Sequence, residues 1–314
     1  MIGNGVRGRL LSVTKQPYGM SKGERRVDGL AILARSMSTA TSGGQNGKPF
    51  KYGNRWQYHS RSDRHSKIAC WAILFDLLHE CALLREHVKA DKVAVGINHK
   101  MRDFAHNRAK DLDLVICRAV RDSHGNMGTF SDLIGPYTIA LDKEEQRRLT
   151  ELPIVHLALP SSVLVALEAK ACMTAFGKAR PRLYDELNSS HLTIHGDTDG
   201  AIAAGFAMVN IAQTFISPIS NHWSFASHEP TITRHRQPKD AASVVAKLME
   251  LPRRARLGEE GFDAFAIALV NCPNDGSPVT VHTSAPAPAP SDIYEYSQMI
   301  GRIAQLYATR FSGI

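Results

Sequence analysis

The feature that most constrains this chain is an apolar run over residues 163–170 that ends in two opposite charges, Glu168 and Lys170. Successive side chains of a strand point to opposite faces, so these two residues emerge side by side on one face at the end of the strand. A buried carboxylate and a buried ammonium are costly unless they pair, bind a metal or take part in chemistry. The run therefore predicts a strand that carries functional charges.

A second apolar strand pattern, over residues 111–117, opens with the acids Asp111 and Asp113. An acid at the head of one strand and Glu-x-Lys on another can hold a divalent cation between two carboxylates, with the Lys170 amine beside the attacked phosphate. Both acids lie on the same strand face, so either can be the ligand. Asp113 is preferred because the apolar residues continue directly from it.

The trio Asp113, Glu168 and Lys170 resembles the Asp…Glu-x-Lys signature of the PD-(D/E)xK, or restriction-endonuclease-like, nuclease superfamily, to which type II restriction endonucleases belong. The resemblance covers residues 66–218, in the order helix, strand, strand, strand, helix, strand. It implies an α/β fold with a mixed β-sheet core flanked by helices. Two departures stand out: Leu112 takes the place of the signature's Pro, and a long insertion must separate Asp113 from Glu168.

The resemblance further implies an endonuclease that hydrolyses DNA phosphodiester bonds in restriction or anti-phage defence, with RNA as the alternative substrate. Asp113 and Glu168 would hold Mg²⁺, for which Mn²⁺ can substitute, and Lys170 would orient or deprotonate the attacking water. Cutters of a two-fold symmetric duplex are usually dimers, so we expect a homodimer on double-stranded DNA. The alternative function is a non-catalytic nucleic-acid-binding or assembly protein that keeps the fold without cleavage.

Positive charge is concentrated before residue 67 in a chain whose formal net charge is +8. This stretch is rich in Gly, Ser and Thr, and predicts a basic arm over residues 1–65 that is poorly ordered unless nucleic acid holds it. No amphipathic helix or lipidation signal accompanies it, which disfavours a membrane partner. The predicted nuclease core with its insertions covers residues 66–284, and a Pro/Ala linker with a C-terminal helix forms an extension over residues 285–314.

Basic residues that alternate with aromatic ones, or that follow the Glu-x-Lys strand closely, are candidates for gripping DNA phosphates. They are Arg55, Arg61, Arg64, Lys178, Arg180 and Arg182. A solvated basic surface is the ordinary alternative for each of them. Weaker candidates, for an additional metal-orienting acid or for reading base edges, are Glu80, Asn221, His222, Arg234 and Arg236.

The periodicity of apolar residues predicts the elements around the motif. A core helix over 67–87 is capped by Asp63 or Ser66, and strands over 92–97 and 112–117 are joined by a polar connector over 98–110. The predicted elements that follow are a strand over 137–141, a helix capped by Asp142, a helix with Pro181 in its first turn, a strand over 205–211 in preference to a small-residue helix, a hairpin of 265–270 with 279–282, and a helix over 293–310.

The five cysteines have no CxxC spacing and several lie in apolar runs, which indicates reduced core thiols. His191 and His195 have ligand-like spacing, but no Cys or acid pair accompanies them, so a zinc site is not expected. No signal peptide opens the chain and no apolar run is long enough to cross a bilayer. The sequence therefore predicts a soluble protein of the cytoplasm.

Overall fold

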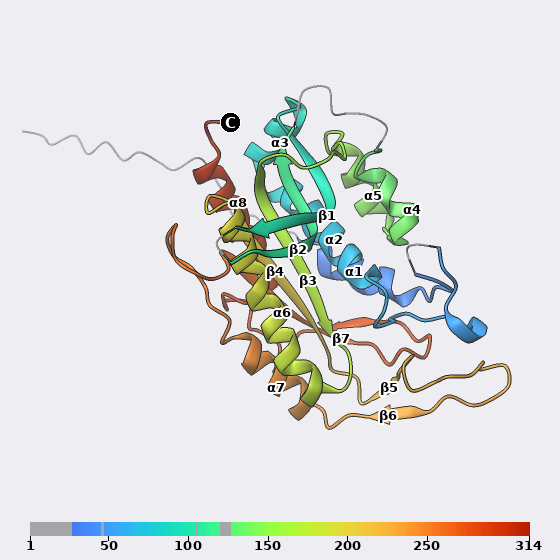
Figure 1. Ribbon diagram of the computed structural model, residues 1–314. Helices are drawn as coiled ribbons and strands as arrows, with labels where there is room; N and C mark the ends of the chain where they lie inside the picture. The colour runs from blue at the N-terminus through green and yellow to red at the C-terminus, as the bar shows by residue number, and fades with distance from the viewer. Residues whose placement is uncertain (1–26, 45–46, 105, 120–126) are drawn as a thin grey trace, which may run out of the picture.

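The computed structural model describes residues 27–44, 47–104, 106–119 and 127–314. Within these residues a six-stranded sheet has the order β1-β2-β3-β4-β7-β8, and β5 and β6 form a separate two-stranded sheet (Figure 1). The pairs β3/β4 and β4/β7 are parallel, whereas β1/β2, β2/β3 and β7/β8 are antiparallel. The protein is therefore a mixed α/β protein, as predicted.

The strands and helices of the described residues have the following bounds. The strands are β1 (Val93–Asp103), β2 (Arg108–Arg118), β3 (Val163–Cys172), β4 (Ile202–Asn210), β5 (Thr214–Ile216), β6 (Ile232–Arg234), β7 (Ala264–Asn271) and β8 (Thr280–His282). The helices are α1 (Gly29–Ser38), α2 (Arg64–Glu80), α3 (Ala82–Lys89), α4 (Ile134–Tyr137), α5 (Lys143–Glu151), α6 (Phe176–Asp197), α7 (Lys239–Leu248) and α8 (Tyr296–Arg310), with short 3-10 turns at Lys51–Gly53 and Ser131–Leu133.

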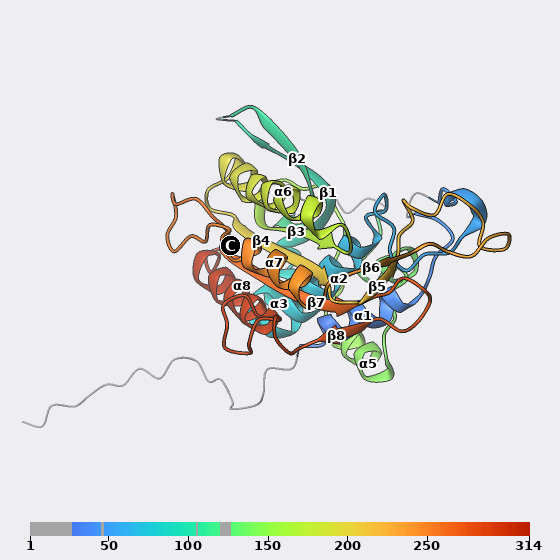
Figure 2. The same ribbon diagram turned by 90° about the horizontal axis from the view of Figure 1, so that it is seen from below.

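Helices cover both faces of the sheet. One face packs against α1, α2 and α8, and the other packs against α6 and α7, as the view from below shows (Figure 2). A strand between two neighbours and under two helical layers must be apolar on both of its faces. β4 meets this requirement, because all of its residues are buried. The strand preference for this segment over a helix is thereby confirmed.

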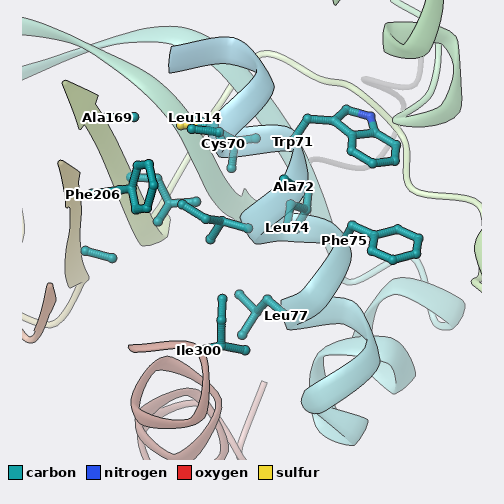
Figure 3. Packing of buried hydrophobic residues seen from close by; sticks show 14 of the residues in the cluster. Cys70, Trp71, Ala72, Leu74, Phe75, Leu77, Leu114, Ala169, Phe206 and Ile300 are labelled. Atoms are coloured by element: carbon teal, nitrogen blue, oxygen red, sulfur yellow. The ribbon is translucent and has the colours of Figure 1, made fainter. Parts of the chain in front are cut away.

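The helix α2 lies inside the molecule and is buried on nearly every side. A helix that is apolar all round is typical of a protein interior. The Trp71 ring stacks on Phe130 with centroids 4.5 Å apart, on the side away from the sheet. On another side Leu77 points toward Ile300 of α8, while Leu114, Ala169 and Phe206 mark the strands that α2 covers (Figure 3). This packing fixes the N-terminal turn of α2 against β2 and β3.

The predicted core helix over 67–87 is wrong in length, because α2 ends at Glu80 and α3 begins after Cys81. The Arg85 side chain donates hydrogen bonds to the carbonyls of Leu78, at 2.7 Å, and His79, at 2.6 Å. These carbonyls lie in the last turn of α2, where no intrahelical donor reaches them. The Arg85 guanidinium of α3 thus stabilises the C-terminal end of α2.

The predicted polar connector over 98–110 is also wrong, because most of it belongs to two long strands. β1 and β2 pair as far as Asp103 and Arg108. β2 pairs with β3 only up to Leu114 opposite Leu167, so beyond that point the hairpin leaves the main sheet. We call residues 98–104 and 106–112 the ribbon; it projects past α6 (Figure 2).

Other sequence predictions had mixed outcomes. The strand predicted over 137–141 is wrong: α4 ends at Tyr137, and Thr138, which follows it, has a left-handed φ of 54°. Pro181 lies inside α6 rather than in its first turn, because that helix begins at Phe176. The Asp142 cap is confirmed with a complete capping box, and the β7–β8 hairpin and the C-terminal helix are confirmed.

The described part of the predicted N-terminal arm packs on the core. Residues 1–26 lie outside the described residues, but α1 shares one apolar cluster with α2, and Trp56 is only 3% exposed. The N–H groups of Asp28 and Gly29 donate to the Asp76 carboxylate of α2 at 2.9 and 2.8 Å. The described residues of this stretch, 27–44 and 47–65, therefore belong to the same packing as the predicted core, and residue 65 marks no break in it.

Candidate active site

Glu168 and Lys170 lie on β3 and contact each other. Lys170 Nζ is 2.7 Å from Glu168 Oε1, and Lys110 Nζ is 3.5 Å from the same oxygen. Glu168 is 1% exposed, whereas the Lys170 side chain is 29% exposed and reaches solvent. Burial raises the pKa of Glu168, and the charge of Asp113 adds to this, while the two lysines act in the opposite direction without cancelling it. These surroundings favour the protonated form of Glu168 more than water would.

Asp113 stands on β2 at the place where the ribbon separates from β3. It is the first residue beyond the pair Leu114–Leu167, which puts it across from Glu168 on the neighbouring strand. Its Oδ1 accepts hydrogen bonds from Ser66 Oγ and Lys67 Nζ, both at 2.9 Å, and its Oδ2 accepts the Ala169 N–H at 3.0 Å. Burial would raise the pKa of Asp113, but Lys67 and the Ala169 N–H outweigh it and lower that pKa.

The sequence did not decide whether Asp111 or Asp113 is the metal ligand, and the structure distinguishes the two acids. Asp111 is exposed on the ribbon opposite Lys100 of β1, whereas Asp113 is buried beside the β3 charges. Asp113 also contributes to the raised pKa of Glu168, which places the two carboxyl groups within electrostatic reach. Asp113, Glu168 and Lys170 therefore form one cluster, and Asp111 is not part of it.

Two lysines that sequence reasoning missed complete the cluster. Lys67 is 1% exposed, and its Nζ binds the Asp113 carboxylate, the Asp113 carbonyl at 3.2 Å and Asn98 Oδ1. Lys110 connects Glu168 to α6, where it donates to Ser190 Oγ and the Glu186 carbonyl. The signal for Lys67 was its helical phase, since it shares a face with the core residues Trp71 and Leu74.

The acids of this cluster fit a hard divalent cation. In the described part of the chain no three His, Cys, Asp or Glu side chains gather as a metal site. Mg²⁺, however, is commonly bound by one or two carboxylates, with water and substrate phosphates as its other ligands. Glu168 Oε2 is buried and has no hydrogen-bond donor among the described residues, which leaves an acceptor that a cation suits. Asp113 and Glu168 are thus the residues that could hold the ion.

Of the residues predicted to bind DNA phosphates, one is buried and five are exposed. Arg64 is buried and donates to the carbonyls of Ser36 and Gln57 and to Thr138 Oγ1, so its role is to hold the chain together and the DNA-binding prediction for it is wrong. The others are exposed: Arg55, Arg61, Lys178, Arg180 and Arg182, of which Arg55 binds the Ala40 carbonyl and Arg182 pairs with Glu186.

The weaker candidates do not join the cluster. Glu80 is at the last turn of α2, whereas Lys67 is in its first, roughly 20 Å away at 1.5 Å per residue. Asn221 is buried and holds its own loop by hydrogen bonds with Ser217 and Thr231, so it cannot read a base edge. His222, Arg234 and Arg236 are exposed on the β5–β6 side of the molecule, and Arg236 pairs with Asp240.

Comparison with protein-family models, curated protein sequences and solved structures gives no match for this chain. Among the residues that the structure describes, none of the helices has the length and apolar character needed to traverse a lipid bilayer. The geometry around Asp113 and Glu168 is accordingly what connects the molecule to a function.

Proposed function

We propose that this chain is a Mg²⁺-dependent endonuclease that hydrolyses DNA phosphodiester bonds on a restriction-endonuclease-like, PD-(D/E)xK fold. The observation that carries the proposal is the position of Asp113 across from Glu168 on adjacent strands, with Lys170 Nζ 2.7 Å from Glu168 Oε1. The order α2, β1, β2, β3, α6, β4 is the order that this fold implies, and it supports the proposal. Action as a cytoplasmic homodimer in restriction or anti-phage defence belongs to the same proposal.

In the proposed reaction a water oxygen bonds to phosphorus, the bond from phosphorus to a sugar oxygen breaks, and that oxygen leaves with a proton. Lys170 would hold the water and stabilise negative charge on the phosphate oxygens, since its ammonium group reaches solvent. Mg²⁺, bound by Asp113 and Glu168, would polarise the phosphate and lower the pKa of the water. Lys110 would keep Glu168 in place by anchoring it to α6.

The test is cleavage of supercoiled plasmid by the purified protein in Mg²⁺. We expect Glu168→Gln and Lys170→Met each to lower the cleavage rate by at least about 100-fold, because each removes a charge that acts on the developing transition state. The matched control is Glu250→Gln, which removes the acid of an exposed pair with Lys247 at 2.6 Å and should cleave at the wild-type rate. Wild-type cleavage by either active-site variant, or full activity in excess EDTA, would contradict the proposal.

A second function is favoured by one observation. Lys67 already neutralises Asp113, and Lys170 and Lys110 contact Glu168, so the acids have counter-charges from the chain itself. Such a cluster suits a nucleic-acid-binding protein that keeps the fold without cleavage. The plasmid assay separates the two functions, because the non-catalytic protein would bind DNA and leave it intact with Mg²⁺ and with Mn²⁺.

A further inference from the structure

The ribbon presents positive charge on the side that no helix covers. Lys100 and Arg102 alternate with the buried Met101, so they lie together on the outer face of β1. The opposite face is closed by α6, where the Asp197 carboxylate accepts the Arg102 N–H at 3.0 Å. Arg108 is exposed at the far end of β2, opposite Asp103. By the strand register Arg108 shares the α6 side of the ribbon with Asp103, whereas Lys100 and Arg102 share the outer face with Asp111, which lies directly opposite Lys100.

The acids across the strands from these cations are Asp111, opposite Lys100, and Asp103, opposite Arg108. Within the described residues no carboxylate lies within ion-pair distance of Lys100, Arg102 or Arg108, although other exposed cations, such as Arg147 and Arg182, do pair with acids. Arg102 instead donates to Asn107 and lies over the Phe104 ring. An exposed strand pair with cations on its outer side and at its far end that form no ion pair with the described acids is complementary to a row of phosphates.

The ribbon is rooted at the candidate active site. Asp113 follows it directly on β2, and Asn98, in β1, binds Lys67 of the cluster. A strand rises about 3.3 Å per residue, so Arg108 lies roughly 17 Å from Asp113 along β2. That distance equals about five base-pair steps at 3.4 Å each. A duplex with its cleaved bond at Asp113 would thus reach the end of the ribbon within half a helical turn.

We propose that the projecting end of the ribbon binds the phosphate backbone of double-stranded DNA on one side of the cleaved bond, through Lys100 and Arg102 on its outer face and Arg108 at its far end. The proposal rests on the proposed nuclease function for the location of the bound DNA, and it assigns the contact to residues outside the reacting cluster. The ribbon residues carry no part of the chemistry. They would determine the affinity for the duplex and its dependence on salt.

The test is fluorescence anisotropy with a labelled 25-base-pair DNA duplex in Ca²⁺ or EDTA, so that no cleavage is needed. The triple variant Lys100→Gln, Arg102→Gln, Arg108→Gln is compared with wild type from about 50 to 300 mM salt. Each lost phosphate contact lowers the slope of log affinity against log salt by about 0.9, so the slope should fall by about 2 to 3. At 0.15 M salt the affinity should fall at least about tenfold.

The matched control neutralises three exposed cations on other surfaces, in Lys89→Gln, Lys143→Gln, Arg256→Gln. Its slope should stay within about one unit of wild type, and both triple variants should melt near the wild-type temperature. An unchanged slope and affinity in the ribbon variant would overturn the inference. If the wild type binds duplex through the ribbon but cleaves nothing in Mg²⁺ or Mn²⁺, the inference stands and the nuclease proposal fails.

Discussion

At the scale of single residues, the pair of Lys67 and Asp113 controls what else can bind at the site. An ammonium that is 1% exposed is stable only beside a charge of opposite sign, and Asp113 Oδ1 at 2.9 Å supplies it. The same carboxylate is one of the two that fit a cation. A divalent ion at Asp113 would therefore compete with the ammonium of Lys67, and this competition can be measured without any cleavage assay.

We expect Lys67→Met to lower the free energy of unfolding by about 3–5 kcal/mol, because it leaves the buried Asp113 carboxylate without its counter-charge. The double variant with Asp113→Asn should recover part of that loss. In Lys67→Met, saturating Mn²⁺ should raise the melting temperature more than in wild type, because the ion no longer displaces an ammonium. Equal Mn²⁺ shifts in the two proteins would show that the ion does not bind at Asp113.

At the scale of elements, a single buried carboxylate ties three helices together. Asp76 of α2 accepts the N–H groups of Asp28 and Gly29 at the start of α1, and it also accepts the Tyr296 hydroxyl of α8 at 2.9 Å. Burial raises the pKa of Asp76 to about 7, although these hydrogen bonds act to lower it. The packing of α1 and α8 on α2 is therefore linked to the protonation of one side chain.

The raised pKa of Asp76 determines how the free energy of unfolding changes with pH. The folded state holds the proton more tightly than the unfolded chain, so this group's contribution to stability is full below about pH 4 and is lost as the pH rises to about 7. For a shift from the ordinary value of 3.8, the loss is on the order of 4 kcal/mol. The difference in unfolding free energy between wild type and Asp76→Asn, measured in urea, should shrink or change sign between pH 5 and pH 8. A difference independent of pH would contradict this.

The elements that could be predicted from the sequence are those whose apolar residues recur at a clear strand or helix spacing. β3 and β4 carry continuous apolar runs, so their strands were found, and the capping box at Asp142 identified α5 from local chemistry alone. The ribbon was missed because this part of β1 and β2 extends beyond the pairing with β3 and carries mostly polar residues, with Met101 as one of its few buried positions. The strand predicted over 137–141 failed because tertiary contacts hold that segment in a helical turn ended by Thr138.

The site was predictable to the extent that its charges stood out in apolar runs. Glu168 and Lys170 interrupt a buried strand, and the sequence therefore marked them. Lys67 and Arg64 were counted with the surface charges, because a basic stretch hides which of its members face the core. The phase of α2 relative to β2 is set by packing, and no local pattern shows that Ser66 and Lys67 meet Asp113.

At the scale of the whole molecule, the two edge strands of the six-stranded sheet, β1 and β8, differ in length. β8 is only three residues long, whereas β1, at the other end, is one of the two longest strands. A long outer strand offers unpaired N–H and carbonyl groups to any other strand that approaches. Near its root β1 is covered, since Val95 exchanges hydrogen bonds with His156 and Ala158. Farther along, Asp197 takes the Arg102 N–H.

Lys100 lies between those two covered points and Arg102 at the second, and their charges repel an identical strand from another copy of the protein, which opposes edge-to-edge aggregation. The neutral triple ribbon variant should therefore remain folded but self-associate at high protein concentration. Light scattering from about 10 µM to 1 mM should show growing particles for this variant, while the matched surface control stays monodisperse. Equal scattering from both would mean that Asp197 and residues 156–158 protect the edge by themselves.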